Sequence, residues 1–154
     1  MGISRIVAKQ YRDKVNQAYH QLGALSLPPE GWLRTLRHAL GMSGPQLAKR
    51  LGVTKARVSK AEKDELTGSV TLKTMQSMAE AMNCRFVYAV IPSEEIEDLI
   101  KRRALQKARE QVKSASTHMA LEAQTLSDEQ LSFEIERLAT EIVEKMPSNL
   151  WSDE

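Results

Sequence analysis

Apolar residues recur at three- and four-residue steps along most of the chain, the spacing that places them on one face of an α-helix. Such faces run over residues 3–22, 32–40, 72–82, 96–119 and 131–146. Gly23 with Pro28-Pro29 ends the first face, Gly41 ends the second and Pro147 ends the last. The pattern therefore predicts a mainly α-helical protein, whose methionines at 75, 78 and 82 fill its core.

The central stretch GMSGPQLAKRLGVTKARVSKAEK predicts two short helices joined by a tight turn. Ser43, followed three residues later by Gln46, forms a capping box, and Thr54 can cap the second helix. Gly52 suits the turn between the two helices. The inward positions are Leu47, Ala48 and Leu51. This order is typical of the helix-turn-helix unit, which binds DNA.

The outer face of the second helix carries the chemistry. If Val58 and Ala61 point to the core, a basic face lies opposite them. In a major groove, lysine can donate to guanine, a serine hydroxyl can bond either way and an alanine methyl can contact thymine. Lys49 and Arg50 are expected near phosphates. We predict a DNA-binding site made of Ser43, Gly44, Gln46, Thr54, Lys55, Ala56, Arg57, Ser59, Lys60 and Lys63.

The stretch CRFVYAVIP, residues 84–92, leaves the helical pattern and predicts one β-strand. A lone strand needs a partner for its backbone N–H and C=O groups. Because the sequence offers no second convincing strand, the economical partner is the same strand of a second copy across a two-fold axis. We expect a homodimer formed through Phe86, Val87, Tyr88, Val90 and Ile91.

Four regions follow from these boundaries: an N-terminal helix and linker (1–30), a helix-turn-helix DNA-binding domain (31–83), the dimerising strand (84–92) and a C-terminal helical region (93–154). Ser93 is expected to cap the first C-terminal helix, because Glu94, Glu95 and Glu97 suit the positive end of a helix. The apolar face over 131–146 is expected to pack internally.

The net charge of +2 conceals an uneven distribution. Residues 1–92 hold 14 Lys and Arg against 6 Asp and Glu, whereas residues 93–154 hold 8 against 14. The first part is therefore net +8 and the second net −6. A basic half predicts a polyanionic partner. The acidic half is either a solvated helix face or a surface for a partner protein.

The helix-turn-helix stretch resembles the Xre family, the lambda-repressor-like DNA-binding domains. From about Gly31, the segments GWLRTLRHALGMSGPQLAKRLGV, SVTLKTMQSMAEAMNCRFVYAVIP, HMALEAQ and NLW are similar to the family named mobile mystery protein A. Many Xre domains carry a glutamine just after the cap of their second helix, where it contacts phosphate. Here Gly44 stands at that position, which leaves its backbone N–H as the donor.

Members of that family are typically encoded beside a Fic-domain protein, an AMP-transferring fold, so the resemblance implies an antitoxin-like DNA-binding partner of a Fic protein. Leu150 and Trp151 are the side chains we expect to anchor such a partner. SLPPEG also fits the Ser/Thr-x-x-x-Glu-Gly/Asn pattern of inhibitory Fic antitoxins. Their inhibitory glutamate lies on a helix, which Pro28-Pro29 would disrupt, so we expect Glu30 to lie in a turn.

The residue pattern does not favour an enzyme. His20, His38 and His118 have no partners at metal-ligand spacing, and no nucleophile elbow, phosphate-cradling glycine loop or Fic active-site signature is present. No apolar run is long enough to span a membrane, and the first residues lack the features of a secretory signal. Cys84 lies in an apolar run, as a structural cysteine would. We expect a cytoplasmic protein without cofactor, metal or disulfide.

Together these patterns predict a lambda-repressor-like helix-turn-helix domain with one β-strand and helical extensions at both ends. We expect a homodimeric transcriptional regulator, an autorepressor that binds a palindromic operator in double-stranded DNA. The alternative is a protein that mainly binds and inhibits a Fic-domain protein, with DNA binding as a secondary activity.

Overall fold

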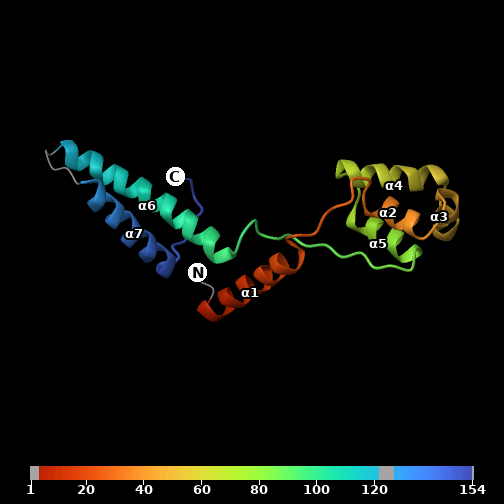
Figure 1. Ribbon diagram of the computed structural model, residues 1–154, viewed down its shortest axis with the longest axis horizontal. Helices are drawn as coiled ribbons and strands as arrows, with labels where there is room; N and C mark the ends of the chain where they lie inside the picture. The colour runs from red at the N-terminus through yellow and green to blue at the C-terminus, as the bar shows by residue number, and fades with distance from the viewer. Residues whose placement is uncertain (1–3, 122–126, 154) are drawn as a thin grey trace. The chain divides into compact units, whose positions relative to one another are not determined.

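The computed structural model describes residues 4–121 and 127–153, with the backbone alone at 116 and 118–121. The described residues form α1 (Arg5–Leu22), α2 (Trp32–Ala39), α3 (Gly44–Leu51), α4 (Lys55–Thr67), α5 (Leu72–Ala81), α6 (Ile96–Leu121) and α7 (Asp128–Lys145). They contain no β-strand. The mainly helical class is confirmed (Figure 1).

The chain divides into two compact units. One is continuous in sequence, Ala24–Ala89, and holds α2 to α5. The other joins Met1–Gly23 to Val90–Glu154 and holds α1, α6 and α7. We call them the continuous unit and the split unit. The continuous unit extends the predicted DNA-binding domain, 31–83, by residues 24–30 and 84–89.

The helices α2 to α5 of the continuous unit enclose one apolar core. Its buried residues are Leu33, Leu47, Ala48, Val58, Ala61, Met75, Met78 and Met82. The three methionines are 6, 4 and 2% exposed, so they fill the core, as their helical spacing predicted. Leu47 and Val58 bring α3 and α4 together at this core, which fixes the angle of the helix-turn-helix pair.

The predicted caps form. Ser43 Oγ accepts from the Gln46 N–H at 3.2 Å, and Gln46 Oε1 accepts from the Ser43 N–H at 2.8 Å, which completes the capping box. Thr54 Oγ1 accepts from the Arg57 N–H at 3.2 Å and starts α4. Between the two helices Gly52 has φ of 71°, a left-handed conformation that glycine adopts without steric cost.

Two carboxylates of α4 hold that helix against α2. Glu62 Oε1 lies 2.7 Å from Arg37 Nε, and both side chains are only 12% exposed. Arg37 Nη1 also donates to the Met42 carbonyl at 3.0 Å. The buried pair thus joins α2, α4 and the loop that leads into α3. Loss of either side chain would leave the charge of the other with little access to water.

The second carboxylate caps α2 from a distance in sequence. Glu65 accepts from the backbone N–H groups of Trp32 at 2.6 Å and Leu33 at 2.9 Å. Gly31 precedes them with φ of 85°, and a Cβ atom there would lie 2.9 Å from the Glu65 carboxyl carbon. Only glycine therefore lets the carboxylate approach so closely.

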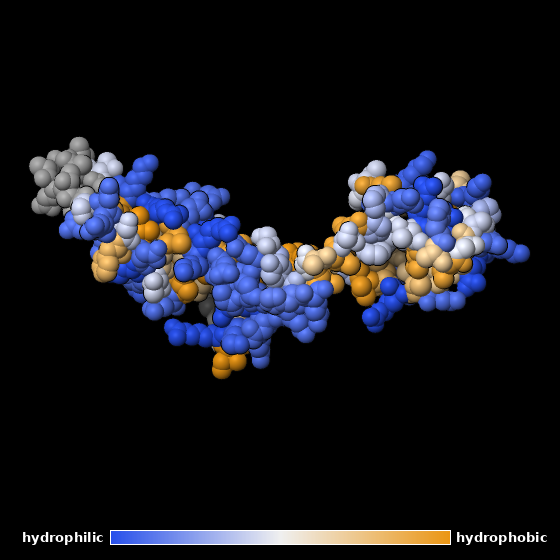
Figure 2. Space-filling view, viewed as in Figure 1, coloured by the Kyte–Doolittle hydropathy of each residue, from blue (hydrophilic) through white to orange (hydrophobic). Residues whose placement is uncertain are grey.

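The predicted β-strand over residues 84–92 does not form. After the Cys84 N–H donates to the Ala79 carbonyl, no described backbone bond involves residues 85–92. A strand requires a ladder of such bonds, and the described part of the chain supplies no second strand to make one. Phe86 instead packs on the apolar core of the continuous unit. Figure 2 shows hydrophobic residues on the surface where the stretches around 24–30 and 84–92 link the two units.

In the split unit, α6 and α7 run antiparallel and bury a narrow apolar seam (Figure 1). The seam consists of Ala104, Ala108, Ala139, Ile142 and Leu150. The small alanines let the two helices approach closely. Ile135, Leu138 and Ile142 of the α7 face therefore pack internally, as predicted, whereas Met146 at the end of that face is 44% exposed.

The segment after α7 folds back onto α6, which corrects the prediction that Leu150 is a partner contact. Leu150 is 2% exposed and belongs to the seam. Arg103 of α6 donates to the Leu150 carbonyl at 2.6 Å and to the Ser152 carbonyl at 2.7 Å. Lys107 also donates to the Ser152 carbonyl. Because these bonds hold the segment against α6, the Leu150 side chain packs in the protein's own core.

The start of α6 also differs from the prediction. The helix begins at Ile96, and Ser93 does not cap it. Instead, the buried Asn16 of α1 accepts from the Ile96 N–H at 2.8 Å and donates to Glu97 at 2.7 Å. A side chain from another helix thus satisfies the first turn of α6, and it docks α1 there.

We expect Arg37→Ala to lower the free energy of unfolding of the continuous unit by about 3 kcal/mol, because it leaves Glu62 buried without a partner. Urea unfolding can be followed by Trp32 fluorescence in a Trp151→Phe background. Arg34→Ala on the same helix is the matched control. Its pair with Glu30 spans 3.8 Å between exposed side chains, so a loss under about 1 kcal/mol is expected. Equal losses would contradict the anchoring role of Arg37.

Candidate nucleic-acid interface

The helix α4 separates its inward and outward residues as predicted. Val58 and Ala61 are 1 and 6% exposed and face the core. The outward positions Thr54, Lys55, Ala56, Arg57, Ser59, Lys60 and Lys63 are all exposed. One helix therefore presents cations, a methyl group and a hydroxyl on a face that the rest of the unit leaves open. These groups match the donors and contacts that read base edges in a major groove.

The predicted residues at the start of α3 have a structural role as well. Ser43 and Gln46 use their side chains in the capping box, so both side chains also hold the helix end in place. Gly44 stands in the first turn with no atom within 4 Å of the place where a Cβ would lie. Its N–H donates to no acceptor among the described residues, which suits a donor to an anion.

The cations near α4 differ in whether the protein itself already binds them. Arg50 donates to the Ala81 carbonyl at 2.6 Å and so closes the end of α5, which differs from the phosphate contact expected for it. In the described part of the chain, the continuous unit contains six cationic side chains without a hydrogen-bond or ion-pair partner: Lys49, Lys55, Arg57, Lys63, Lys73 and Arg85. All but Arg85 lie on α3, α4 or α5.

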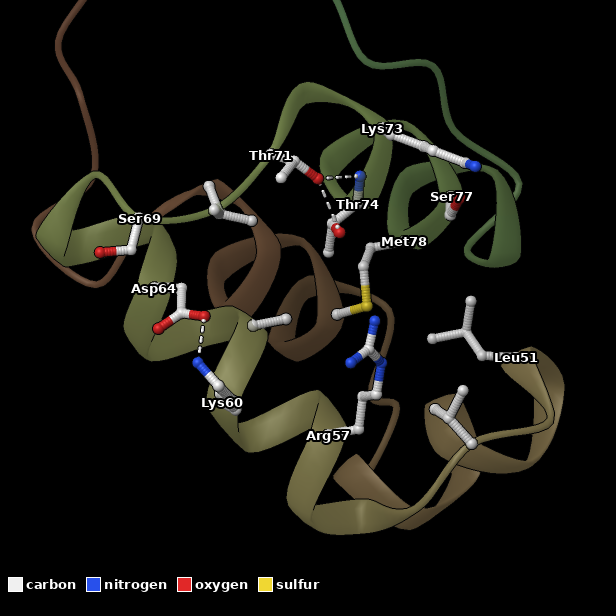
Figure 3. Close-up of a pocket in the computed structure, with 13 residues that line it drawn as sticks. Leu51, Arg57, Lys60, Asp64, Ser69, Thr71, Lys73, Thr74, Ser77 and Met78 are labelled. Carbon is white, nitrogen blue, oxygen red and sulfur yellow. Dashed lines mark hydrogen bonds and ion pairs between the residues drawn. The ribbon is translucent and has the colours of Figure 1, made fainter.

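A groove of about 560 Å³ runs between α4 and α5 (Figure 3). Its cations are Arg57, Lys60 and Lys73, and its hydroxyl groups belong to Ser69, Thr71, Thr74 and Ser77. Sequence reasoning missed the α5 side of this groove. Thr71 caps α5 and Lys73 lies in its first turn, but these local features do not show that α5 lies alongside α4. The groove places positive charge beside the reading face of α4.

Lys60 lies at the edge between the reading face and this groove. Its ammonium group contacts Asp64 at 2.8 Å, one helical turn further on. Figure 3 shows the two side chains joined within the groove. The Lys60 side chain is 70% exposed, whereas that of Asp64 is 26% exposed. The structure thus gives this lysine of the predicted DNA-binding site an acidic neighbour.

The predicted dimerisation residues occupy different environments. Val87, Tyr88 and Val90 are 66, 70 and 89% exposed. Phe86 and Ile91 are half-buried, and the Phe86 ring stacks on that of Tyr88 with centroids 5.9 Å apart. Val87, Tyr88 and Val90 thus form an exposed apolar run, and their backbone N–H and C=O groups have no partner among the described residues.

The other candidates stay separate from the α4 face. Trp151 is 62% exposed, and the Arg103 guanidinium lies 5.9 Å from the centre of its ring. Glu30 lies in a turn, as expected, and pairs with Arg34 at the surface.

The histidines show no metal-binding arrangement. His20 pairs with Glu95, His38 is exposed, and the side chain of His118 lies outside the described residues. No group of three or more His, Cys, Asp or Glu in the described residues could hold a metal ion. Cys84 is half-buried, with its Sγ 3.3 Å from the Met82 carbonyl oxygen. None of the described helices is long and apolar enough to span a membrane.

Residues 33–88 match the helix-turn-helix family model. The match includes α3 and α4, the two helices that carry the predicted interface, together with α5 and most of α2. No curated protein and no solved structure matches the chain. The chain thus contains an Xre-type helix-turn-helix domain, which supports a DNA-binding regulator.

We expect Arg57→Ala to weaken DNA binding and to make it less sensitive to salt. The Arg57 side chain has no partner in the described structure, so it is available to neutralise a phosphate. Removing one phosphate contact should reduce the slope of log affinity against log salt by about 0.9. Fluorescence anisotropy with a labelled duplex measures this slope. Arg34→Ala, which removes a cation elsewhere in the unit, should leave it unchanged. A wild-type slope for Arg57→Ala would remove Arg57 from the interface.

Proposed function

We propose that this protein is a sequence-specific transcriptional regulator of the cytoplasm that binds a palindromic operator as a homodimer and represses its own gene. The observation that carries the proposal is the exposed basic face of α4, which lies opposite the buried Val58 and Ala61. In a helix-turn-helix domain the second helix of the pair enters the major groove. Here that helix is α4.

The chemistry of this face supports base readout. Lys55 stands in the first turn of α4, where the side chains of a recognition helix contact base edges. Its ammonium can donate to the O6 and N7 acceptors of guanine. Ala56 and Ser59 follow on the exposed side, and they offer a methyl group for thymine and a hydroxyl for either kind of base. The face therefore carries sequence-reading groups as well as charge.

The charge of the continuous unit supports binding to the DNA backbone. Residues 24–89 hold ten Lys and Arg against five Asp and Glu, a net charge of +5. The unpartnered cations on α3 and α5, Lys49 and Lys73, flank α4 in the chain on either side. Phosphate contacts of this kind orient a domain on the duplex and give it most of its non-specific affinity.

The segment 84–92 supports association of two copies. Its exposed Val87, Tyr88 and Val90 form an apolar run on the surface. The backbone groups of residues 85–92 have no described partners. Alignment of this segment with its own copy across a two-fold axis would cover the apolar side chains and pair the backbone groups. A two-fold dimer then requires an operator with two-fold symmetry.

Selection from a random duplex library tests this function. We expect recovered sites with two symmetric half-sites, each bound by one copy, and light scattering should give a dimer for the free protein at micromolar concentration. Tyr88→Asp should reduce the dimer fraction and weaken operator binding, because it places a charge in the apolar contact. Leu66→Asp is the control, since Leu66 is also largely exposed but lies at the end of α4.

Recovery of no preferred sequence would contradict base readout. A monomeric wild type would contradict the dimer while leaving readout by a single domain in place. Equal loss of dimer in Leu66→Asp and Tyr88→Asp would show that any added charge disrupts association, which would remove the 84–92 segment as the contact.

A second candidate function is the binding of a Fic-domain protein, as the family resemblance implies. The exposed ring of Trp151 favours it, because a large aromatic group held in place by Arg103 can anchor a partner at little entropic cost. Deletion of the C-terminal segment is not a clean test, since it would remove Leu150 from the seam between α6 and α7.

Trp151→Ala is the better variant for this second function. It should abolish co-purification with a co-expressed Fic-domain protein while leaving operator binding and the thermal melt unchanged. Phe133→Ala is the control, because Phe133 on α7 is 68% exposed, close to the value for Trp151. Full co-purification of Trp151→Ala would rule out Trp151 as the anchor.

A further inference from the structure

The groove between α4 and α5 contains one carboxylate. Arg57, Lys60 and Lys73 supply its cations, and Asp64 is the single acidic residue that lines it. Arg57 and Lys73 have no described side-chain partner, whereas Lys60 contacts Asp64 at 2.8 Å. One cation of the groove is therefore held by the protein itself, in a place where the proposed function needs cations for phosphates (Figure 3).

The backbone around Asp64 is well anchored. Its carbonyl accepts from the N–H groups of Ser69 at 2.9 Å and Val70 at 3.1 Å, which close the turn between α4 and α5. The Thr67 hydroxyl also donates to this carbonyl at 3.3 Å. These bonds fix the backbone of Asp64 in the last turn of α4, and its side chain lines the groove from there.

We propose that Asp64 limits the affinity of the protein for the DNA backbone, because its carboxylate restrains Lys60 and so weakens a phosphate contact with a duplex of any sequence. This inference rests on the proposed function. A phosphate that approaches the groove meets the negative charge of Asp64. It must also compete with that carboxylate for the ammonium of Lys60. Both effects weaken a contact that every duplex offers.

The effect falls on a phosphate contact and leaves the base contacts unchanged, because the two kinds of contact differ in origin. Non-specific affinity comes almost entirely from phosphates neutralised by lysine and arginine. Specific affinity adds base contacts, which the proposed readout assigns to Lys55, Ala56 and Ser59 on the exposed face of α4. A carboxylate that weakens a phosphate contact without touching the base contacts lowers the affinity for every sequence by the same factor, so the ratio of specific to non-specific binding stays unchanged.

The test compares Asp64→Asn with the wild type on a labelled duplex of random sequence and on the selected operator, by fluorescence anisotropy from 50 to 200 mM salt. With Lys60 released to neutralise one further phosphate, the slope for the random duplex should steepen by about 0.9. Its affinity should then fall about three- to fourfold more across that salt range than the wild type's does. The affinity for both duplexes at 50 mM salt should rise, whereas the ratio of operator to random affinity should stay unchanged.

Glu80→Gln is the matched control, because it removes a carboxylate from α5 of the same unit that does not line the groove. Asp64→Glu keeps the charge within reach of Lys60 and should behave like the wild type. Lys60→Gln combined with Asp64→Asn should return the slope to the wild-type value. Equal slopes for Asp64→Asn and Glu80→Gln would overturn the proposal, since any lost acid would then act alike.

Lys60→Gln alone keeps the test decisive if Asp64→Asn does not fold, because the exposed Lys60 makes no other hydrogen bond or ion pair within the described residues. A restrained Lys60 contributes little to random-duplex binding, so this variant should keep the wild-type slope. A slope lower by the full 0.9 would overturn the proposal, since Lys60 would already be neutralising a phosphate. Failure of the wild type to bind any duplex would instead contradict the proposed function.

Discussion

The buried contact between Arg37 and Glu62 is the interaction on which the proposed interface depends. A helix that reads bases must keep its exposed side chains within a fraction of an ångström of their positions, and α4 has only two inward apolar side chains, Val58 and Ala61, in its first seven residues. Glu62 ties the helix to α2, and Glu65 ties it again by capping the first turn of α2. The acids of α4 therefore work mostly on its inner side and leave the outer side to cations.

Because its acids hold α4 from the inner side, this short helix can carry much positive charge on its outer side. Lys55, Arg57 and Lys63 repel one another, yet none of them is needed to hold α4 in place. Asp64 departs from the pattern because it lies at the border between the packed side of the helix and the groove. Its position lets the protein moderate its positive field at one point without losing charge elsewhere.

Features set by local sequence could be predicted, whereas features set by contacts between distant segments could not. The capping box of Ser43 and Gln46, the inward side chains of α4 and the methionine core all follow from spacing within a few residues. The β-strand prediction failed because residues 84–92 satisfy the composition of a strand but find no partner in the described chain. Composition alone cannot supply the ladder.

The same reasoning applies to the two errors in the split unit. Ser93 has the right chemistry for a cap, but Asn16 provides the acceptor from another helix. Leu150 follows a proline and looked like part of a free end, yet it fills the seam between α6 and α7.

In the candidate site, the reading face was predictable from helix geometry. The α5 side of the groove was not, because it depends on how the turn at Ser69 and Val70 brings α5 alongside α4.

The contact of Asn16 with the start of α6 has a consequence for the order in which the protein folds during synthesis. The helix α1 is made first, but its docking site at Ile96 and Glu97 leaves the ribosome only after the whole of Ala24–Ala89. The continuous unit has all of its core residues within that span, so it can complete its core before the docking site of α1 is synthesised. The helix-turn-helix domain is thus formed before the unit whose two parts enclose it in the sequence.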